Sequence, residues 1–112
     1  MNIEMPRGDI RHVAFQILDT AGEPVSSAFS EIYITFKQNY NTTNYLFQKR
    51  LSAGDVIFAD GSYEFTIEPE DTNNLKFGDY VFDIELLAPG IKETHVGTLT
   101  LTSEATHQQN EG

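Results

Sequence analysis

The 112-residue sequence contains no cysteine and no tryptophan, and it has few basic residues: seven lysines and arginines against 17 aspartates and glutamates. The absence of cysteine excludes disulfides, thiolate nucleophiles and sulfur-ligated zinc sites. The formal net charge of −10 argues against binding to nucleic acid or to an anionic membrane surface, because both require a cationic face. No apolar run approaches the roughly 20 residues of a membrane-spanning helix. The N-terminus also lacks the basic and apolar segments of a signal peptide.

Aromatic residues are well represented, with eight phenylalanines and five tyrosines, and 39% of the sequence is hydrophobic. This composition predicts an ordered core, and the length fits one domain. Beyond Ser103 the sequence is polar and without pattern. We therefore expect a single domain over residues 1–106 and a disordered polar tail over residues 107–112.

Stretches of alternating apolar and polar residues predict seven β-strands, and no segment has the pattern of a helix of normal length. Turn signals such as Asp60-Gly61 and Pro89-Gly90 lie between them. The expected strands run approximately over Asp9–Leu18, Phe29–Gln38, Tyr45–Leu51, Asp55–Ala59, Ser62–Glu68, Asp79–Ala88 and Thr94–Thr102. This spacing indicates an all-β fold, and we predict an immunoglobulin-like antiparallel β-sandwich of about seven strands.

The most informative segment runs from Pro69 to Leu87 and combines a polar corner with a long amphipathic strand. Asp71 is expected to accept hydrogen bonds from backbone amides at the corner, and Gly78 to release the backbone before the strand. The hydroxyl of Tyr80 is expected to bond back to the corner, as in immunoglobulin-like sandwiches. The residues predicted to hold the corner and the core are Tyr80, Phe82, Ile84, Phe36, Ile34, Phe65, Asp71 and Gly78.

No group of residues has the spacing of a catalytic or metal site. His12, His95 and His107 show no metal-ligand spacing, and no serine lies in a nucleophile elbow. The carboxylates of Glu68, Glu70 and Asp71 lie at the predicted corner, where backbone capping is favoured over catalysis, with calcium binding as the functional alternative. We therefore predict a protein that is not an enzyme and needs no metal or cofactor.

Tyrosines flank a polar loop that is predicted to be the tip of a hairpin, Asn39–Asn44. Tyr40 and Tyr45 have the chemistry to stack on sugar rings, but tyrosine is also common at half-buried strand positions. Packing on the sheet surface, or contact with a partner, is favoured over a sugar platform.

Several motifs resemble a known family. They are Arg7-Gly8-Asp9, the turn Asp19–Val25, the Pro69-Glu-Asp-Thr72 block with Gly78-Asp-Tyr-Val-Phe-Asp-Ile84, and Gly97-x-Leu99-x-Leu101. Over about residues 7–106 the chain resembles the N-terminal domain of phage baseplate upper proteins. It is also similar to small immunoglobulin-like proteins from the structural regions of phages and prophages of Gram-positive bacteria.

The resemblance implies a non-enzymatic structural module of a virion, either a connector or a decoration protein of the tail or baseplate. Its partners would be other virion subunits or further copies of itself, and it would be found in the virion or, during assembly, in the host cytoplasm. The alternative is a carbohydrate-binding module that recognises bacterial cell-surface glycan through Tyr40 and Tyr45. Residues Met1–Pro6 lie outside the expected strands, and pairing with a neighbouring subunit is one hypothesis for them.

Overall fold

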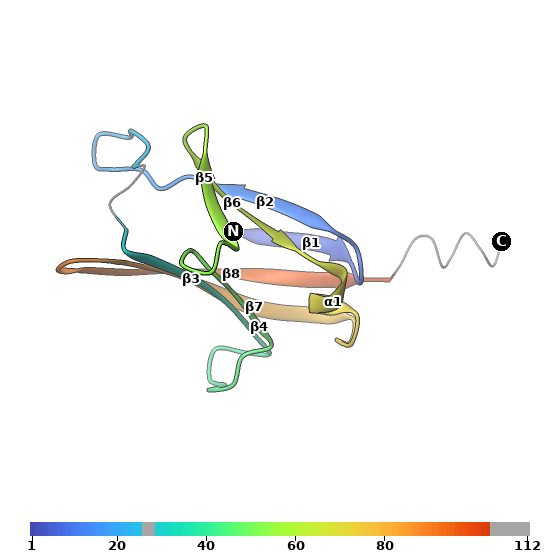
Figure 1. The fold of residues 1–112 in the computed structure, drawn as a ribbon. Coiled ribbons are helices and arrows are strands. Elements are labelled where there is room, and N and C mark those ends of the chain that lie inside the picture. Colours follow the sequence, from blue (N-terminus) through green and yellow to red (C-terminus); the bar gives the residue numbers. More distant parts are fainter. Residues whose placement is uncertain (26–28, 104–112) are drawn as a thin grey trace.

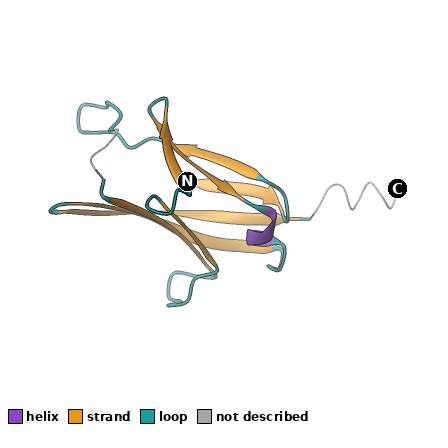
Figure 2. Cartoon of the chain, viewed as in Figure 1, coloured by secondary structure: helices purple, strands orange, loops and turns teal. Residues whose placement is uncertain are grey.

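The computed structural model describes residues 1–25 and 29–103. The predicted tail, the predicted domain boundary at residue 106 and His107 lie outside the described residues. One cluster of buried hydrophobic side chains occupies the space between two β-sheets (Figure 1). The fold is an all-β sandwich, as predicted from the alternating pattern (Figure 2).

Eight strands and one single-turn helix make up the described chain. They are β1 (Asn2–Pro6), β2 (Arg11–Phe15), β3 (Glu31–Lys37), β4 (Phe47–Arg50), β5 (Val56–Ala59), β6 (Ser62–Ile67), α1 (Pro69–Thr72), β7 (Gly78–Ala88) and β8 (Ile91–Thr102). The larger sheet has the order β1-β8-β7-β3-β4, and the smaller one has the order β2-β6-β5. All neighbouring strands are antiparallel except β1 and β8, which are parallel.

The period-2 pattern of the sequence corresponds to the two faces of each sheet. Along β7 the side chains of Tyr80, Phe82, Ile84 and Leu86 are buried, and the residues between them are half-buried. The turn that joins β5 to β6 has positive φ at both Asp60 (52°) and Gly61 (81°). Positive φ at both central residues is the geometry of a tight hairpin turn, which Asp-Gly adopts readily.

Aromatic rings from both sheets form the centre of the core. Phe36 of β3 stacks on Phe47 with 4.2 Å between ring centroids and lies 4.9 Å from Phe82 of β7. Phe65 of β6 reaches Phe36 from the other sheet at 6.3 Å. Ile34, Ile84 and Tyr80 are buried in the same cluster, as the sequence predicted. Each such side chain contributes about 1.5–3 kcal/mol by its removal from water.

The N-terminal segment is the main correction to the sequence-based expectation. β1 is not among the predicted strands; it pairs with β8 of the same chain and forms one edge of the larger sheet. Pairing of these residues with a neighbouring subunit stays a prediction, and only the other side of β1 is left for it. Ile3 and Met5 face the core opposite Leu99 and Leu101. Met1, Ile3 and Met5 alternate with polar residues, but five residues before Pro6 are a short stretch on which to recognise a strand period.

Strand boundaries also differ from the prediction. The first predicted strand, Asp9–Leu18, is limited to Arg11–Phe15, and beyond it Leu18 makes only an isolated bridge to Pro24. The strands predicted over Phe29–Gln38 and Tyr45–Leu51 are shorter at both ends, at Glu31–Lys37 and Phe47–Arg50. In each case the remaining residues of the predicted strand lie in the connecting loops. Apolar residues continue into these loops after the hydrogen bonds between the strands have ended, so the pattern predicts strands that are too long.

The corner between β6 and β7 is a single helical turn followed by a loop. Thr72 at the end of α1 is fully buried, and its hydroxyl accepts a hydrogen bond from the backbone N–H of Gly8 at 2.8 Å. The hydroxyl of Tyr80 donates to the carbonyl oxygen of Lys76 at 2.7 Å, so the predicted bond to the preceding loop is present. Gly78 has a φ of 134°, a conformation that favours glycine. Among the described residues no helix is long and apolar enough to cross a membrane.

Candidate functional site

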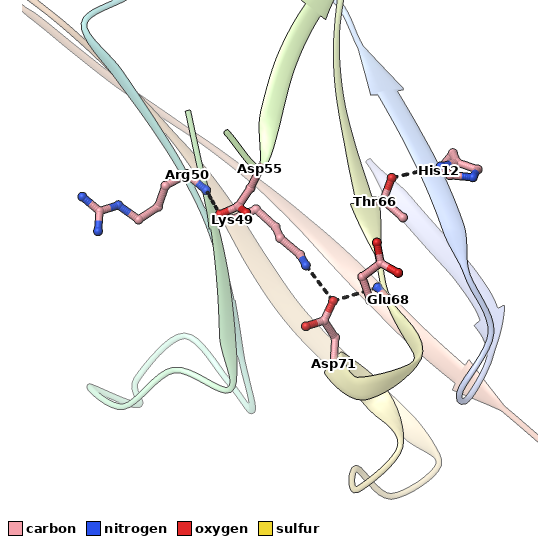
Figure 3. A network of polar contacts seen from close by, with 7 residues as sticks. All are labelled: His12, Lys49, Arg50, Asp55, Thr66, Glu68 and Asp71. Atoms are coloured by element: carbon pink, nitrogen blue, oxygen red, sulfur yellow. Dashed lines mark hydrogen bonds and ion pairs between the residues drawn. The ribbon is translucent and has the colours of Figure 1, made fainter. Parts of the chain in front are cut away.

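A polar groove of about 470 Å³ lies beside α1, on the outer face of the smaller sheet (Figure 3). Its walls come from three places: β2 and β6, the segment that ends β4 and begins β5, and the start of α1. The polar side chains that line it are His12, Lys49, Asp55, Glu64, Thr66, Glu68 and Glu70. Four of these seven residues are carboxylates, so the groove has an excess of negative charge.

The ion pair between Lys49 and Asp71 joins β4 of the larger sheet to α1 at one end of this groove. Lys49 Nζ lies 2.7 Å from Asp71 Oδ2, and both side chains are largely buried, with 12% and 14% of their surface exposed. The same Asp71 oxygen accepts the backbone N–H of Glu68 at 2.8 Å. Asp71 therefore caps the first turn of α1, as predicted, and also neutralises a cation that burial would otherwise destabilise.

The remaining polar contacts of the groove also hold the backbone or neighbouring side chains. His12 Nδ1 lies 2.9 Å from Thr66 Oγ1 across the β2–β6 pair. Asp55 Oδ2 accepts the backbone N–H of Arg50 at 3.1 Å, which closes the loop between β4 and β5. In the part of the chain that the structure describes, no three histidine or acidic side chains are grouped so that they could hold a metal ion. The arrangement is suited to attracting a cationic group to Glu64, Glu68 and Glu70.

Two carboxylates outside the groove have shifted pKa values. Burial raises the pKa of Glu31, but hydrogen bonds from Ser52 and from the backbone N–H of Ile32, together with the charge of Arg50, outweigh burial and lower it. Burial raises the pKa of Asp83, and Lys37 opposes the shift only in part. Glu31 therefore links the start of β3 to the end of β4 through its charged form.

A second groove, of about 580 Å³, lies where the hairpin of β7 and β8 extends beyond the smaller sheet. The turn of this hairpin projects at the left of Figure 1. The apolar lining comes from Phe15, Ile17 and Leu18 on one side and from Ile84 and Leu86 on the other. Residues 93–96 of β8 form its rim, and Val96 there is 59% exposed. This groove is the more apolar of the two.

The rim of the second groove is an open sheet edge. β8 is 12 residues long, but β1 pairs only with Thr98–Thr102. Within residues 1–25 and 29–103, no strand pairs with Ile91–Gly97 on the side away from β7. An unpaired strand edge presents a row of N–H and C=O groups that can pair with another chain. The edge strand β5 of the smaller sheet also exposes Ile57 (54%) and Phe58 (39%).

The predicted surface tyrosines do not form a single platform. Tyr40 and Tyr45 are both about half exposed, at 50% and 56%. The hydroxyl of Tyr40 donates to the carbonyl oxygen of Gly97 at 3.1 Å, which ties the loop after β3 to β8. Among the described residues no ring contact joins the two tyrosines. Tyr40 thus holds its loop against β8, and Tyr45 is the more exposed of the two residues.

Sequence reasoning missed the open edge of β8. Glu93 and His95 both lie on this edge, with Glu93 Oε2 3.5 Å from His95 Nε2 and both side chains more than half exposed. Glu93 lies outside the predicted strand, which begins at Thr94. β8 begins at Ile91, but the polar residues at 92–95 hide the start of the strand from an apolar pattern.

Comparisons of the chain with models of protein families, with curated proteins and with solved structures found no match.

Proposed function

We propose that this protein is a non-enzymatic structural module of a phage or prophage virion that assembles with other subunits through its open sheet edges. The observation that carries the proposal is the unpaired stretch of β8 at Ile91–Gly97, which lies along the apolar groove. An edge of this kind offers backbone hydrogen bonds to a neighbour, and the adjoining groove offers pockets for its side chains. A connector or decoration protein of a tail or baseplate needs such a surface rather than a catalytic cleft.

The strand order supports an immunoglobulin-like assignment of the sandwich. Matching β2, β6 and β5 to one sheet and β8, β7, β3 and β4 to the other gives the division of strands found in that architecture. The hydrogen bond from Tyr80 lies near the start of the strand that corresponds to the penultimate one, where such domains have their tyrosine corner.

The residues of the resemblance have physical roles in this fold. Asp71 and Thr72 fix the corner, and Tyr80, Phe82 and Ile84 fill the core. These residues support a shared fold with the phage structural proteins. The open edges support the proposed function itself, because assembly requires a surface that can bind a neighbouring subunit. The charge of −10 favours solubility before assembly.

The proposal is tested on particles purified from a host that carries the gene. We expect quantitative mass spectrometry to find the protein at a fixed copy number per particle. Thr94→Pro, which removes a backbone donor from the open edge, should lower incorporation, whereas Thr94→Val keeps the donor and should be incorporated normally. Absence of the protein from purified particles, together with unchanged particles from a host lacking the gene, would overturn the proposal.

A second candidate function is binding of bacterial cell-surface glycan. It is supported by Tyr45, whose ring is 56% exposed in the loop between β3 and β4 and makes no contact with another aromatic ring of the described chain. Sedimentation with purified host cell walls tests it. Tyr45→Ala should abolish binding, whereas Phe77→Ala, which removes an equally exposed ring from a different loop, should not. Equal sedimentation of both variants would reject Tyr45 as the sugar platform.

A further inference from the structure

We propose that the open edge of β8 is occupied by β8 of a second copy of this chain, antiparallel, with a two-fold axis through Thr94. This inference deepens the proposed function and rests on it, because it names the first partner of the edge through which the module assembles. It joins the larger sheets of two copies into one continuous sheet.

The backbone groups that face the open edge follow from the contacts of β1. The N–H of Thr98 donates to Met1 O at 3.0 Å, and Thr102 O accepts from the N–H of Arg7 at 3.1 Å. Even-numbered residues of β8 therefore direct their backbone groups toward β1. Because this direction alternates along a strand, the N–H and C=O groups of Lys92, Thr94 and Val96 point to the open edge.

One two-fold register uses all three of these positions. With the axis at Thr94, Lys92 pairs with the partner's Val96, Thr94 with the partner's Thr94, and Val96 with the partner's Lys92. All three are hydrogen-bonded pairs, because every residue involved directs its backbone groups across the interface. A two-fold axis here gives an isologous contact, which closes after two copies and does not continue into a fibre.

The same register places a carboxylate opposite an imidazole at two positions of the interface. Glu93 and His95 lie between the hydrogen-bonded positions, so Glu93 faces the partner's His95 and His95 faces the partner's Glu93. These are the closely spaced, non-hydrogen-bonded pairs of an antiparallel ladder. Within one chain Glu93 Oε2 already lies 3.5 Å from His95 Nε2. In the dimer each carboxylate gains a second imidazole partner, which stabilises a cross-strand pair.

Other registers are worse on the same grounds. An axis at Glu93 places Glu93 directly opposite the partner's Glu93, and like charges in that position destabilise the pair. An axis at His95 or Val96 requires Thr98, whose N–H is already bonded to Met1. With the axis at Thr94, the partner's turn approaches Met1, which is half exposed and lies outside β1.

The partner strand also covers the mouth of the apolar groove. Val96, at the rim, is 59% exposed in the single copy. Val96 pairs with Asp83, so its side chain lies on the opposite face of the sheet from Ile84 and Leu86, which line the groove and are already 5% and 0% exposed. A second strand along the rim can cover Val96 on one face and the partly buried Phe15 and Ile17 on the other, so the hydrophobic effect adds to the backbone pairing. The net charge of the two copies opposes association, and salt weakens that repulsion.

A charge exchange between two variants tests the register. Glu93→Lys removes the carboxylate that faces the partner's His95, and His95→Glu places glutamate opposite the partner's Glu93. Because each change occurs twice in the two-fold dimer, each variant alone should dimerise about tenfold more weakly or worse. In a mixture of the two, the introduced lysine faces the introduced glutamate, and the remaining His95 faces the remaining Glu93. The heterodimer should therefore form within about threefold of the native affinity. Sedimentation velocity gives the affinities, and native mass spectrometry with a heavy-nitrogen label on one variant distinguishes the heterodimer.

Both substituted side chains are more than half exposed, so the urea midpoint serves as the control for folding. An independent variant adds four residues before Met1. These residues continue β1 along the open edge and should suppress dimerisation, whereas the same residues after Gly112 should not. A protein that stays monomeric from about 1 μM to about 1 mM, or a mixture that forms no preferred heterodimer, would overturn the inference. If the protein is monomeric but is still incorporated into particles, the inferred dimer is wrong and the proposed function is retained.

Discussion

The hydroxyl of Tyr80 can be removed from the corner with little change in packing, so the effect of its hydrogen bond can be measured separately. Tyr80→Phe keeps the ring, which is 4% exposed and packed in the core, and removes only the hydrogen bond of 2.7 Å to Lys76 O. No cavity larger than one oxygen atom forms. The effect is therefore that of one hydrogen bond, without the large packing loss of a truncation.

The magnitude follows from what happens to each partner. A typical intramolecular hydrogen bond contributes about 1 kcal/mol net, and more where the partner is left buried without a substitute. Lys76 lies in an exposed loop, so its carbonyl oxygen can bond to water. We therefore expect a loss of about 1 kcal/mol. For a domain of this size that corresponds to roughly 4 °C in Tm, or to about 0.5–1 M in the urea midpoint.

Equilibrium urea unfolding, followed by tyrosine fluorescence and far-UV circular dichroism, measures the effect. The matched control is Tyr45→Phe, which removes a hydroxyl from a ring that is 56% exposed and should leave the midpoint unchanged. Equal midpoints for the two variants would refute the reasoning, because the corner bond would then contribute nothing beyond what water supplies.

Three further predictions concern the larger sheet and the polar groove. Gly97→Ala should lower stability by about 1–3 kcal/mol in urea unfolding, since an added Cβ would lie 2.5 Å from both Met1 O and Phe82 Cζ. Glu31→Gln should cost about 1 kcal/mol at neutral pH. Because the folded-state pKa of Glu31 is lowered, its contribution is full above the ordinary value of 4.5 and is lost as the pH falls through the folded pKa, so a pH series of midpoints for the two proteins should converge in acid. Asp71→Ala should lower the free energy of unfolding by about 2 kcal/mol, as measured by urea unfolding. In a Lys49→Met background the loss should be smaller, because no buried cation is left without a partner. Equal losses in the two backgrounds would contradict the pairing.

The sequence predicted the elements whose pattern is local. Alternation from Tyr80 to Leu86 identified β7 and its buried face, and Asp60-Gly61 identified a hairpin turn. The corner was predictable because proline, acidic residues and glycine each restrict the backbone in a known way. Strand ends were predicted less well, because a hydrophobic residue such as Phe29 packs against the core without joining the ladder.

The candidate sites were less predictable, because they depend on residues far apart in the sequence. Lys49 and Asp71 form an ion pair across 22 positions, and no spacing rule brings them together. The apolar groove combines the segment that follows β2 with the inner face of the β7–β8 hairpin. Its existence depends on how far one sheet extends beyond the other, which follows from the packing of the layers and not from the pattern of either strand.

β1 shows how one unpredicted element determines where a partner can bind. The strand has five residues, and its parallel pairing covers Thr98–Thr102 of β8 and stops there. Without β1 the whole edge of β8 would be open, and a second copy could pair in several registers. Because β1 occupies one half, the exposed backbone groups are reduced to those of Lys92, Thr94 and Val96, and one two-fold axis uses all three. The strand that completes the core with Ile3 and Met5 thus also specifies the register of the proposed dimer.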